Sequence, residues 1–314
     1  MKVHLLNVRE GDCTIIEHSS GRTSMIDICA GNIETETRRL GINLRENVGS
    51  NNLRSAISHD SLRGIPFSTS NGRGGNYQMK NSPTNPIDYL KDQLGLKDLH
   101  RFISTHPDMD HMDGFDRLCN EIELINFWHT GVYRNAPSFS GSRYKEDDWN
   151  SYCRVRNGER DHITVITPKA GCRFSCANGL EGMDHDSLYI LSPDPSLVDE
   201  AASSGNLNDG SYVILYKSPI GDIIFAGDAH DKTWKYILEN YETSVSNCKF
   251  LLAPHHGRHS GANFEFLDVV RPSLTLFGCA SSEYLAYSAW NNRGLNFITQ
   301  NQCGNVILED FNGE

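Results

Sequence analysis

Residues 104–114 read STHPDMDHMDG, and this stretch decides how the rest of the chain is interpreted. Two histidines and three aspartates fall within eight positions, directly after the apolar segment LHRFI. Carboxylates brought this close together repel one another and destabilise a fold unless a cation neutralises them. The alternative is a solvated acidic turn, which needs no particular spacing. The spacing here is typical of a set of metal ligands, namely His106, Asp108, Asp110 and His111.

The composition agrees with a cation-binding protein. The chain has 314 residues and a formal charge of −11, and it is long enough for one large domain or two modest ones. No block of lysine and arginine predicts a basic tail or helix for nucleic acid or membrane. The negative charge does not exclude a phosphate substrate, because bound metal ions would reverse the local field.

No targeting segment is evident in the sequence. The apolar start of the chain is interrupted by Asn7, Arg9 and Glu10, and no apolar run of about eighteen residues follows anywhere. Nine cysteines occur without a C-x-x-C pair. We therefore expect reduced thiols, a cytoplasmic location and no membrane association.

Apolar segments bounded by turn residues predict many strands and a few helices. The expected strands are 2–8, 13–18, 23–28, 100–105, 122–128, 187–193, 211–218, 222–228, 248–254, 273–279, 295–300 and 305–310. The expected helices are 86–96, 112–122, 232–241 and 265–270. This pattern favours an α/β protein built as one large unit.

Two polar stretches interrupt the pattern. The first, at about 32–86, is rich in Gly, Ser and Asn, and we expect a lid or a partner-docking loop there. The second, at about 134–185, is also polar, and its part 134–162 is expected to be irregular apart from Trp149 and Tyr152. No linker separates two units, so we expect 1–314 to form a single domain with these two insertions.

Three strands end in groups that can bind metals. The sequences are THPDMDH after the strand at 100–105, GDAH after 222–226, and PHHG after 248–253. Functional groups at strand ends gather at one edge of a sheet. Imidazole and carboxylate together suit Zn, Mn or Fe, and the candidates are too many for one tetrahedral ion. They match two divalent ions about 3.5–4 Å apart.

In these motifs the chain resembles the metallo-β-lactamase superfamily, whose signature is H-x-H-x-D-H followed later by a Gly-Asp. It is most similar to the ComEC-type metallohydrolases of DNA uptake and their stand-alone relatives. The segment HPDMDH has the aspartate of that subgroup, and VREGDCTII, FAGDAH and APHHGRHSG also correspond. The resemblance covers roughly 1–31, 99–130 and 186–310. It implies an αβ/βα sandwich of two mixed sheets with helices outside and metals at one edge.

The resemblance also implies the ligands of two divalent metal ions, Zn or Mn, with Mg as a further option. His106 and Asp108 would bind the first ion, Asp110 and His111 the second, and Asp228 would bridge them. Asp110 would in addition steer the attacking water, which makes it a catalytic residue.

Further roles are expected around these ligands. Adjacent histidines that leave a strand point in opposite directions, so we predict His255 as a metal ligand and His256 as a catalytic acid facing the substrate. Asp27 resembles a carboxylate that orients a ligand. The later histidine of the family, in a Y-x-H-P context, is missing, and Tyr284 and Tyr287 occupy that region.

Three residues near the motifs are predicted to bind substrate: Arg258, His230 and His259. Arg258 can bind two phosphate oxygens at once, although an ordinary loop arginine would look the same in sequence.

The resemblance implies a metal-dependent phosphodiesterase or nuclease that acts on nucleic acid or a nucleotide. Two alternatives remain. One is hydrolysis of a lactone, amide or thioester on the same centre. The other is a weakly catalytic metal-binding subunit of a multi-protein bacterial system, which the missing histidine and the negative charge favour. A protein partner or a homodimer stays open.

Overall fold

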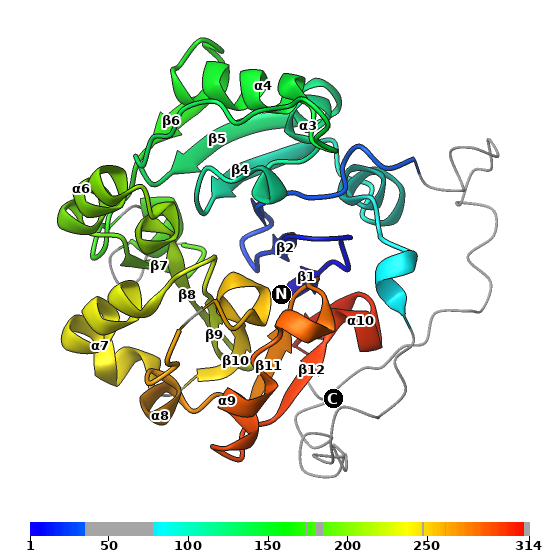
Figure 1. The fold of residues 1–314 in the computed structure, drawn as a ribbon. Helices are drawn as coiled ribbons and strands as arrows, with labels where there is room; N and C mark the ends of the chain where they lie inside the picture. The colour runs from blue at the N-terminus through cyan, green and yellow to red at the C-terminus, as the bar shows by residue number, and fades with distance from the viewer. Residues whose placement is uncertain (35–77, 174, 180–184, 247, 261, 311–314) are drawn as a thin grey trace.

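The computed structural model describes residues 1–34, 78–173, 175–179, 185–246, 248–260 and 262–310. Its strands form two mixed sheets, one of seven strands and one of six. Figure 1 shows the two sheets in the middle of the molecule and helices on their outer sides. The predicted αβ/βα sandwich is therefore confirmed.

The first sheet has the order β13-β1-β2-β3-β4-β5-β6. Strands β13, β1, β2 and β3 are antiparallel neighbours, and β3 to β6 run parallel. The bounds are β1 Lys2–Leu5, β2 Thr14–Glu17, β3 Thr23–Ile26, β4 Asp98–Ser104, β5 Glu123–His129, β6 Thr164–Ile166 and β13 Val306–Glu309.

The second sheet has the order β12-β11-β10-β9-β8-β7 and repeats the same plan. Strands β7, β8 and β9 are antiparallel, and β9 to β12 run parallel. The bounds are β7 Leu188–Ser192, β8 Val213–Ser218, β9 Gly221–Phe225, β10 Cys248–Leu252, β11 Leu274–Phe277 and β12 Phe297–Thr299. Each sheet thus brings the carboxyl ends of its parallel strands to one edge.

The core between the sheets follows the period-two pattern of the strands. On β4 Ile103 belongs to the inter-sheet core, whereas its neighbour Phe102 packs with the helices outside. On β10 Leu252 faces the inter-sheet core and Leu251 faces outward. Strands β10 and β11 are buried on both faces over most of their length, and their sequences are accordingly almost continuously apolar.

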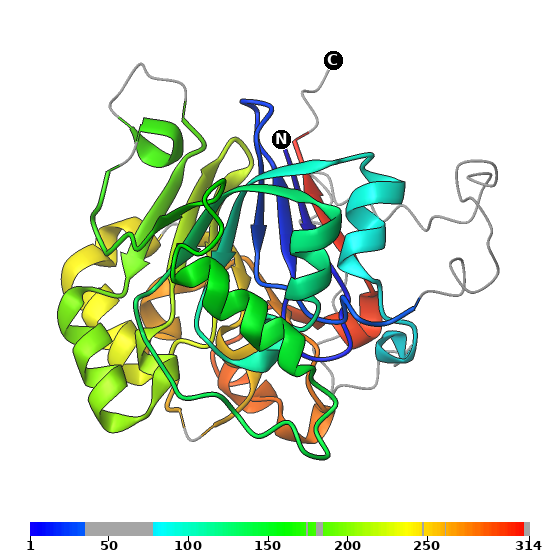
Figure 2. The same cartoon turned by 90° about the horizontal axis from the view of Figure 1, so that it is seen from above.

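Helices cover both outer faces, as Figures 1 and 2 show for α3 and α4 beside β4 and β5. Phe115 of α3 and Tyr152 of α4 pack in the outer core of the first sheet, and Trp234 of α7 packs in that of the second. The α-helices are α2 Pro86–Asp88, α3 Phe115–Glu121, α4 Glu146–Arg156, α5 Ser175–Asn178, α6 Pro195–Ser204, α7 Asp231–Val245, α8 Leu267–Val270, α9 Tyr287–Asn291 and α10 Gln300–Cys303.

Short 3-10 and π-helical turns complete the fold. They are η3 Met79–Asn81, η4 Tyr89–Gln93, η5 Met109–His111, η6 Leu207–Gly210, η7 Pro254–Gly257 and η8 Ser282–Tyr284. The turns η5 and η7 follow β4 and β10 and carry two of the three predicted ligand motifs.

The stretch 134–185 is more ordered than its polar composition predicts. It contains α4, which buries Trp149 and Tyr152, and β6, which is an edge strand of the first sheet. Helix α4 has acidic residues in its first turn and Arg154 and Arg156 in its last, which complements the helix dipole. Helix α6, capped by Asp194, was also not expected. Most of the stretch 32–86, including the predicted lid, lies outside the described residues.

Two further findings concern the sequence expectations. Within the described ranges, no helix has both the length and the apolar composition needed to cross a bilayer. The cysteines whose side chains are described are free thiols, and these are Cys13, Cys29, Cys119, Cys153, Cys172, Cys248, Cys279 and Cys303.

A buried ion pair fixes the start of β7 against the first sheet. Asp186 accepts a contact of 2.6 Å from Arg101 on β4 and one of 3.0 Å from Arg22. The side chain of Arg101 is only 1 % exposed, and its guanidinium also donates to Ser24 and lies over the ring of Trp128. The carboxylate therefore neutralises a charge that is held in the core.

We predict that Asp186→Asn lowers the free energy of unfolding by about 3–5 kcal/mol, because it leaves the buried Arg101 charge uncompensated. Urea denaturation of both proteins measures the change. Lys235→Gln, which removes an exposed ion pair with Glu239, is the matched control and should change stability by less than about 1 kcal/mol. Equal effects of the two substitutions would contradict the role of Asp186.

Candidate metal centre

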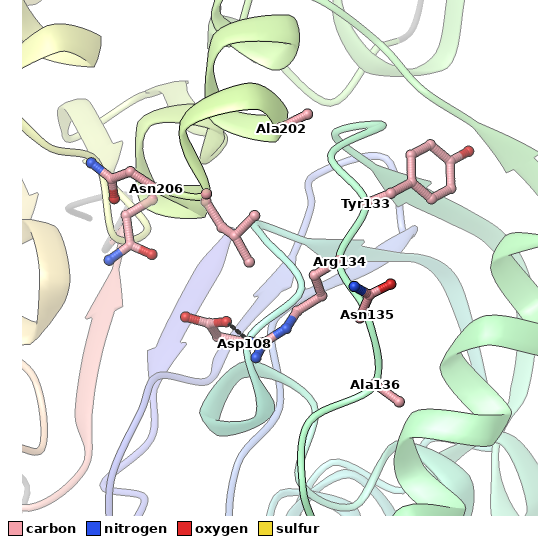
Figure 3. A pocket seen from close by; sticks show the side chains of 10 residues that line it. Asp108, Tyr133, Arg134, Asn135, Ala136, Ala202 and Asn206 are labelled. Carbon is pink, nitrogen blue, oxygen red and sulfur yellow. Dashed lines mark hydrogen bonds and ion pairs between the residues drawn. The ribbon is translucent and has the colours of Figure 1, made fainter.

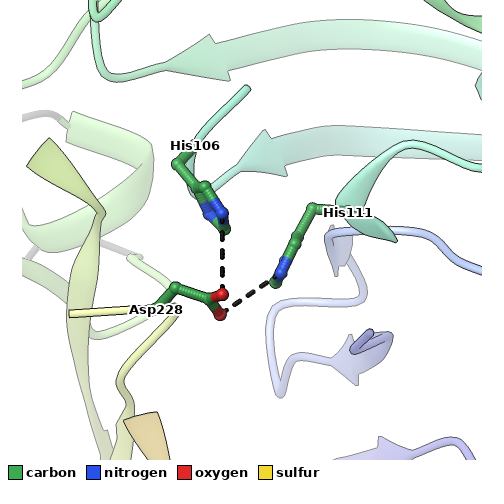
Figure 4. A group of neighbouring side chains, drawn as sticks. All are labelled: His106, His111 and Asp228. Atoms are coloured by element: carbon green, nitrogen blue, oxygen red, sulfur yellow. Dashed lines mark ion pairs between the residues drawn. The ribbon is translucent and has the colours of Figure 1, made fainter. Parts of the chain in front are cut away.

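Three imidazoles converge on one buried carboxylate at the edge where the two sheets meet. His106 and His111 follow β4, Asp228 follows β9, and His256 follows β10. The Oδ1 atom of Asp228 lies 3.2 Å from His111 Nε2 and 3.7 Å from His256 Nε2. Its Oδ2 atom lies 3.7 Å from His106 Nε2. Figure 4 shows His106 and His111 pointing at Asp228 from one side.

The far side of each ring is held by a carboxylate or a hydroxyl. His111 Nδ1 lies 2.7 Å from Asp27, and His256 Nδ1 lies 3.0 Å from Asp12. Thr105 Oγ1 donates to Asp27 and lies 3.1 Å from His106 Nδ1. Because each Nδ1 faces an acceptor, each Nε2 is directed at the cluster and can give its lone pair to a cation that displaces the proton.

The inward-facing atoms have no hydrogen-bond partner among the described residues. They are Nε2 of His106, His111 and His256, and Oδ1 of Asp228. Buried polar atoms are almost always paired, so four unpaired atoms in one place are typical of a site that binds a further group. Three overlapping groups have their ligand atoms within 4.8 Å of one another: His106, His111 and Asp228; Asp110, His111 and His256; Asp12, Asp228 and His256. Their mix of nitrogen and oxygen donors fits a divalent transition metal.

The electrostatics also favour positive charge at this place. Burial lowers the pKa of His111, but the carboxylates of Asp228 and Asp27 outweigh burial and hold that pKa well above its ordinary value. Asp12 and Asp228 likewise outweigh burial at His256 and raise its pKa to about 10. Despite its own burial, Asp228 has a pKa well below the ordinary value because three histidines surround it.

Asp110 and Asp108 occupy different positions relative to the cluster. Asp110 Oδ2 lies 3.4 Å from His256 Nε2 and 4.0 Å from His111 Nε2, so it belongs to one of the three groups. Asp108 Oδ2 lies 3.5 Å from His106 Nε2, but its Oδ1 is paired with Arg134, and Asp108 is in none of the groups. Of the four motif residues, His106, Asp110 and His111 therefore belong to the groups of converging ligand atoms. Asp108 is instead paired with Arg134.

The two adjacent histidines do not leave β10 as an extended strand. His255 and His256 both have positive φ, 50° and 57°, within the turn η7. The premise that they point in opposite directions therefore does not apply. His256 is fully buried in the cluster, whereas His255 lies at its margin, with Nε2 3.6 Å from Asp228 Oδ2 and a side chain 19 % exposed. This geometry places His256, predicted to face the substrate, among the groups that can bind a metal.

The predicted substrate residues lie outside the cluster. His230 Nε2 is 3.1 Å from His255 Nδ1 and 3.4 Å from the Asn208 amide. Arg258 is half-buried, and its backbone bridges Leu285. His259 is exposed, and its ring packs against Phe264.

Sequence reasoning missed the role of Asp12, although it used the motif that contains this residue. Gly11 has φ 76°, and a Cβ there would lie 1.9 Å from the backbone oxygen of Asp110. A Cβ at Gly278 would lie 2.5 Å from Asp12 Oδ1. Glycines at both positions let the Asp12 loop approach the cluster. The Gly11-Asp12 pair in VREGDCTII is the sequence feature that could have indicated this role.

Comparison with known proteins gives only distant likenesses. No protein-family model matches the chain, and no curated protein matches it. Among solved structures it is similar to a metal-dependent hydrolase of the β-lactamase superfamily, with 10 % identity, a TM-score of 0.49, and 99 % of each chain covered.

Two further solved structures are similar at the same level. A diphosphatase from the PhnP family has 11 % identity and a TM-score of 0.42, over 99 % of this chain and 98 % of that one. Zinc-bound PqqB from Methylobacterium extorquens has 9 % identity and a TM-score of 0.43, over 98 % and 100 %.

We predict that Asp12→Asn and Asp27→Asn each weaken metal binding by about 10–100-fold, because they loosen the rings of His256 and His111. Calorimetric titration of metal-free protein with Zn²⁺ or Mn²⁺ measures the affinity. Asp268→Asn removes an exposed carboxylate, 58 % exposed, that pairs with Arg293, and should leave the affinity unchanged. Wild-type affinity in both test variants would show that the two carboxylates do not support ligands.

Proposed function

We propose that this chain is a metal-dependent hydrolase of the metallo-β-lactamase superfamily and that its substrate is a phosphodiester. One observation carries the proposal. Three histidines whose Nδ1 atoms are fixed from behind direct unpaired Nε2 atoms at Asp228 in a fully buried position. Such a set is costly to bury unless a metal ion uses it.

The two oxygens of Asp228 support two ion sites that share this carboxylate. The Oδ2 side faces His106 and His255, with Asp108 next to His106. The Oδ1 side faces His111 and His256, and Asp110 stands beside these two rings. We assign the first set to one divalent cation and the second set to another. On this assignment, His256 supplies the nitrogen ligand that the missing later histidine would otherwise supply.

When bound, the two cations supply an acidified water and neutralise the charge that develops on the phosphate. The protein residues position the reacting groups. Asp110 is 23 % exposed and stands at the open side of the cluster, where its carboxylate can accept the proton of the attacking water. Asp27 and Asp12 keep the rings of His111 and His256 in place during the reaction. On this assignment His256 would contact Asp12 through Nδ1 and a cation through Nε2, so the proton for the leaving group has to come from elsewhere. His230, next to His255, is the proposed donor.

Two features support a phosphodiester over the other substrates. Asp108 replaces an imidazole of the family signature with a harder oxygen ligand, which leans toward Mn or Mg and phosphate chemistry. The motifs near Asp12, Asp228 and His255 also resemble the ComEC-type subgroup. Nucleic acid or a nucleotide is therefore the proposed substrate class.

Metal content and a substrate panel test this function. We expect the purified protein to bind two divalent ions and to hydrolyse bis-p-nitrophenyl phosphate and DNA in linear, circular or single-stranded form. Asp228→Asn should lose at least one ion and about 10³-fold in rate, because the shared carboxylate loses its charge. Faster hydrolysis of p-nitrophenyl acetate or a lactone would favour the ester or lactone alternative. Metal binding without any hydrolysis would favour a metal-binding subunit.

The two histidines of η7 give a separate test of the ligand assignment. We expect His256→Ala to lose about one bound ion per chain. The ring is fully buried, so bulk solvent does not reach its position to supply a water ligand in its place. His255→Ala should lower the affinity for the other ion by a smaller factor, because its ring is partly exposed and solvent can take its place. Atomic absorption after dialysis gives the metal content of both variants. Full metal content in His256→Ala, with loss only in His255→Ala, would restore the assignment expected from sequence.

A further inference from the structure

A cavity of about 690 Å³ opens beside the histidine–aspartate cluster. One wall is the segment 133–136, which follows β5, and the other is the segment 202–208, which contains the end of α6 and the start of η6. Asp108 lines the same cavity and lies 3.5 Å from His106 Nε2. The cavity therefore reaches the edge of the cluster at Asp108, and Figure 3 shows Asp108 paired with Arg134 among the lining residues.

Arg134 lines the cavity next to Asp108. Its guanidinium pairs with Asp108 Oδ1, and the two side chains are 29 % and 30 % exposed. Among the described residues that line the cavity, Arg134 is the only cation and Asp108 the only anion. The rest of the polar lining comes from the amides of Asn135, Asn206 and Asn208 and from Tyr133, whose ring is 57 % exposed.

Asp108 has two competing partners. Its Oδ2 is within reach of the site proposed around His106, yet its Oδ1 is bound to a guanidinium that a cation at that site would repel. The positive charge of Arg134 on one oxygen of Asp108 lowers the affinity of the other oxygen for a cation. While the pair with Arg134 persists, Asp108 is a poor metal ligand, which agrees with its absence from the groups of converging ligand atoms.

The charge of the cluster gives Arg134 a second reason to be there. Five carboxylates stand in or directly behind the cluster, namely Asp12, Asp27, Asp108, Asp110 and Asp228. The two divalent cations proposed above neutralise four of these charges. The guanidinium of Arg134 neutralises the fifth, so an anion that draws Arg134 away leaves the charge of Asp108 available to the cation proposed beside His106.

We propose that Arg134 binds the anionic group of the substrate in this cavity and thereby releases Asp108 to complete the first metal site. This inference rests on the proposed function, since the anionic group is taken to be the phosphate of a phosphodiester. Arginine suits the task because its planar fork binds phosphate oxygens as readily as carboxylate oxygens. The three asparagine amides can then hydrogen-bond the uncharged part of the substrate.

The release of Asp108 is tested without substrate by a double-mutant cycle of Arg134→Gln and Asp108→Asn, titrated with Mn²⁺ or Zn²⁺ by calorimetry. We expect Arg134→Gln to bind the first ion about tenfold more tightly than wild type. In the Asp108→Asn background the same substitution should have no such effect. Loss of a positive charge alone would tighten binding equally in both backgrounds and would overturn the exchange, as would unchanged affinity in Arg134→Gln.

The matched control is Arg154→Gln, which removes an exposed arginine that also stands beside a carboxylate, Glu159. It should bind metal like wild type. A tighter site in this control would mean that net charge, rather than the Asp108 contact, sets the affinity.

The binding of substrate is tested with a charged and a neutral probe. For Arg134→Gln we expect KM for bis-p-nitrophenyl phosphate to rise about tenfold or more, with Arg134→Lys intermediate and KM for p-nitrophenyl acetate unchanged. An unchanged KM for the diester would overturn the role of Arg134 while leaving the hydrolase function intact. A wild-type protein that binds metal but cleaves neither probe would overturn the proposed function, and the metal titration would still decide whether Arg134 restrains Asp108.

Discussion

The carboxylate of Asp228 sits in a position that only positive charge can stabilise. It is buried, and imidazole nitrogens of His106, His111 and His256 lie 3.2–3.7 Å from its oxygens. Asp12 and Asp27 stand behind two of these rings and add further negative charge. The pKa values of His111 and His256 shift upward in response, and the same demand for positive charge favours divalent cations at the cluster.

The fold meets this constraint by joining the strand ends of two sheets. The Tyr212 amide, just before β8, donates to the backbone oxygen of Thr105 after β4, which ties the two sheets together next to the cluster. The amide of His255 donates to the oxygen of Gly227, so the loops after β9 and β10 are also joined. Each ligand-bearing loop is therefore held by backbone bonds as well as by its side chains. Such support keeps unpaired ligand atoms in place.

The local motifs predicted more of the site than of the surrounding helices. The cluster at 106–111 and the position of Asp228 follow from short segments at strand ends, whereas the role of Asp27 was expected from the family resemblance. Helix α4 was not predicted because most of its residues are charged or polar. Its buried apolar side chains are only Trp149, Tyr152 and Val155. Asp12 escaped notice as a site residue because its partner, His256, is 244 positions away in the chain. No local pattern encodes a contact of that kind.

The sequence by itself determined which residue types stand at the strand ends, and hence that imidazoles and carboxylates meet at one edge of a sheet. Only the tertiary structure decided which of these side chains enter the cluster and which stay at its margin. It turned His256 inward, because positive φ at two successive residues of η7 breaks the alternation of an extended strand. It also set Asp108 against Arg134, which follows a different strand, β5. The sequence shows which side chains are able to bind a metal. The direction in which each of them points depends on backbone turns and on charges from distant segments of the chain.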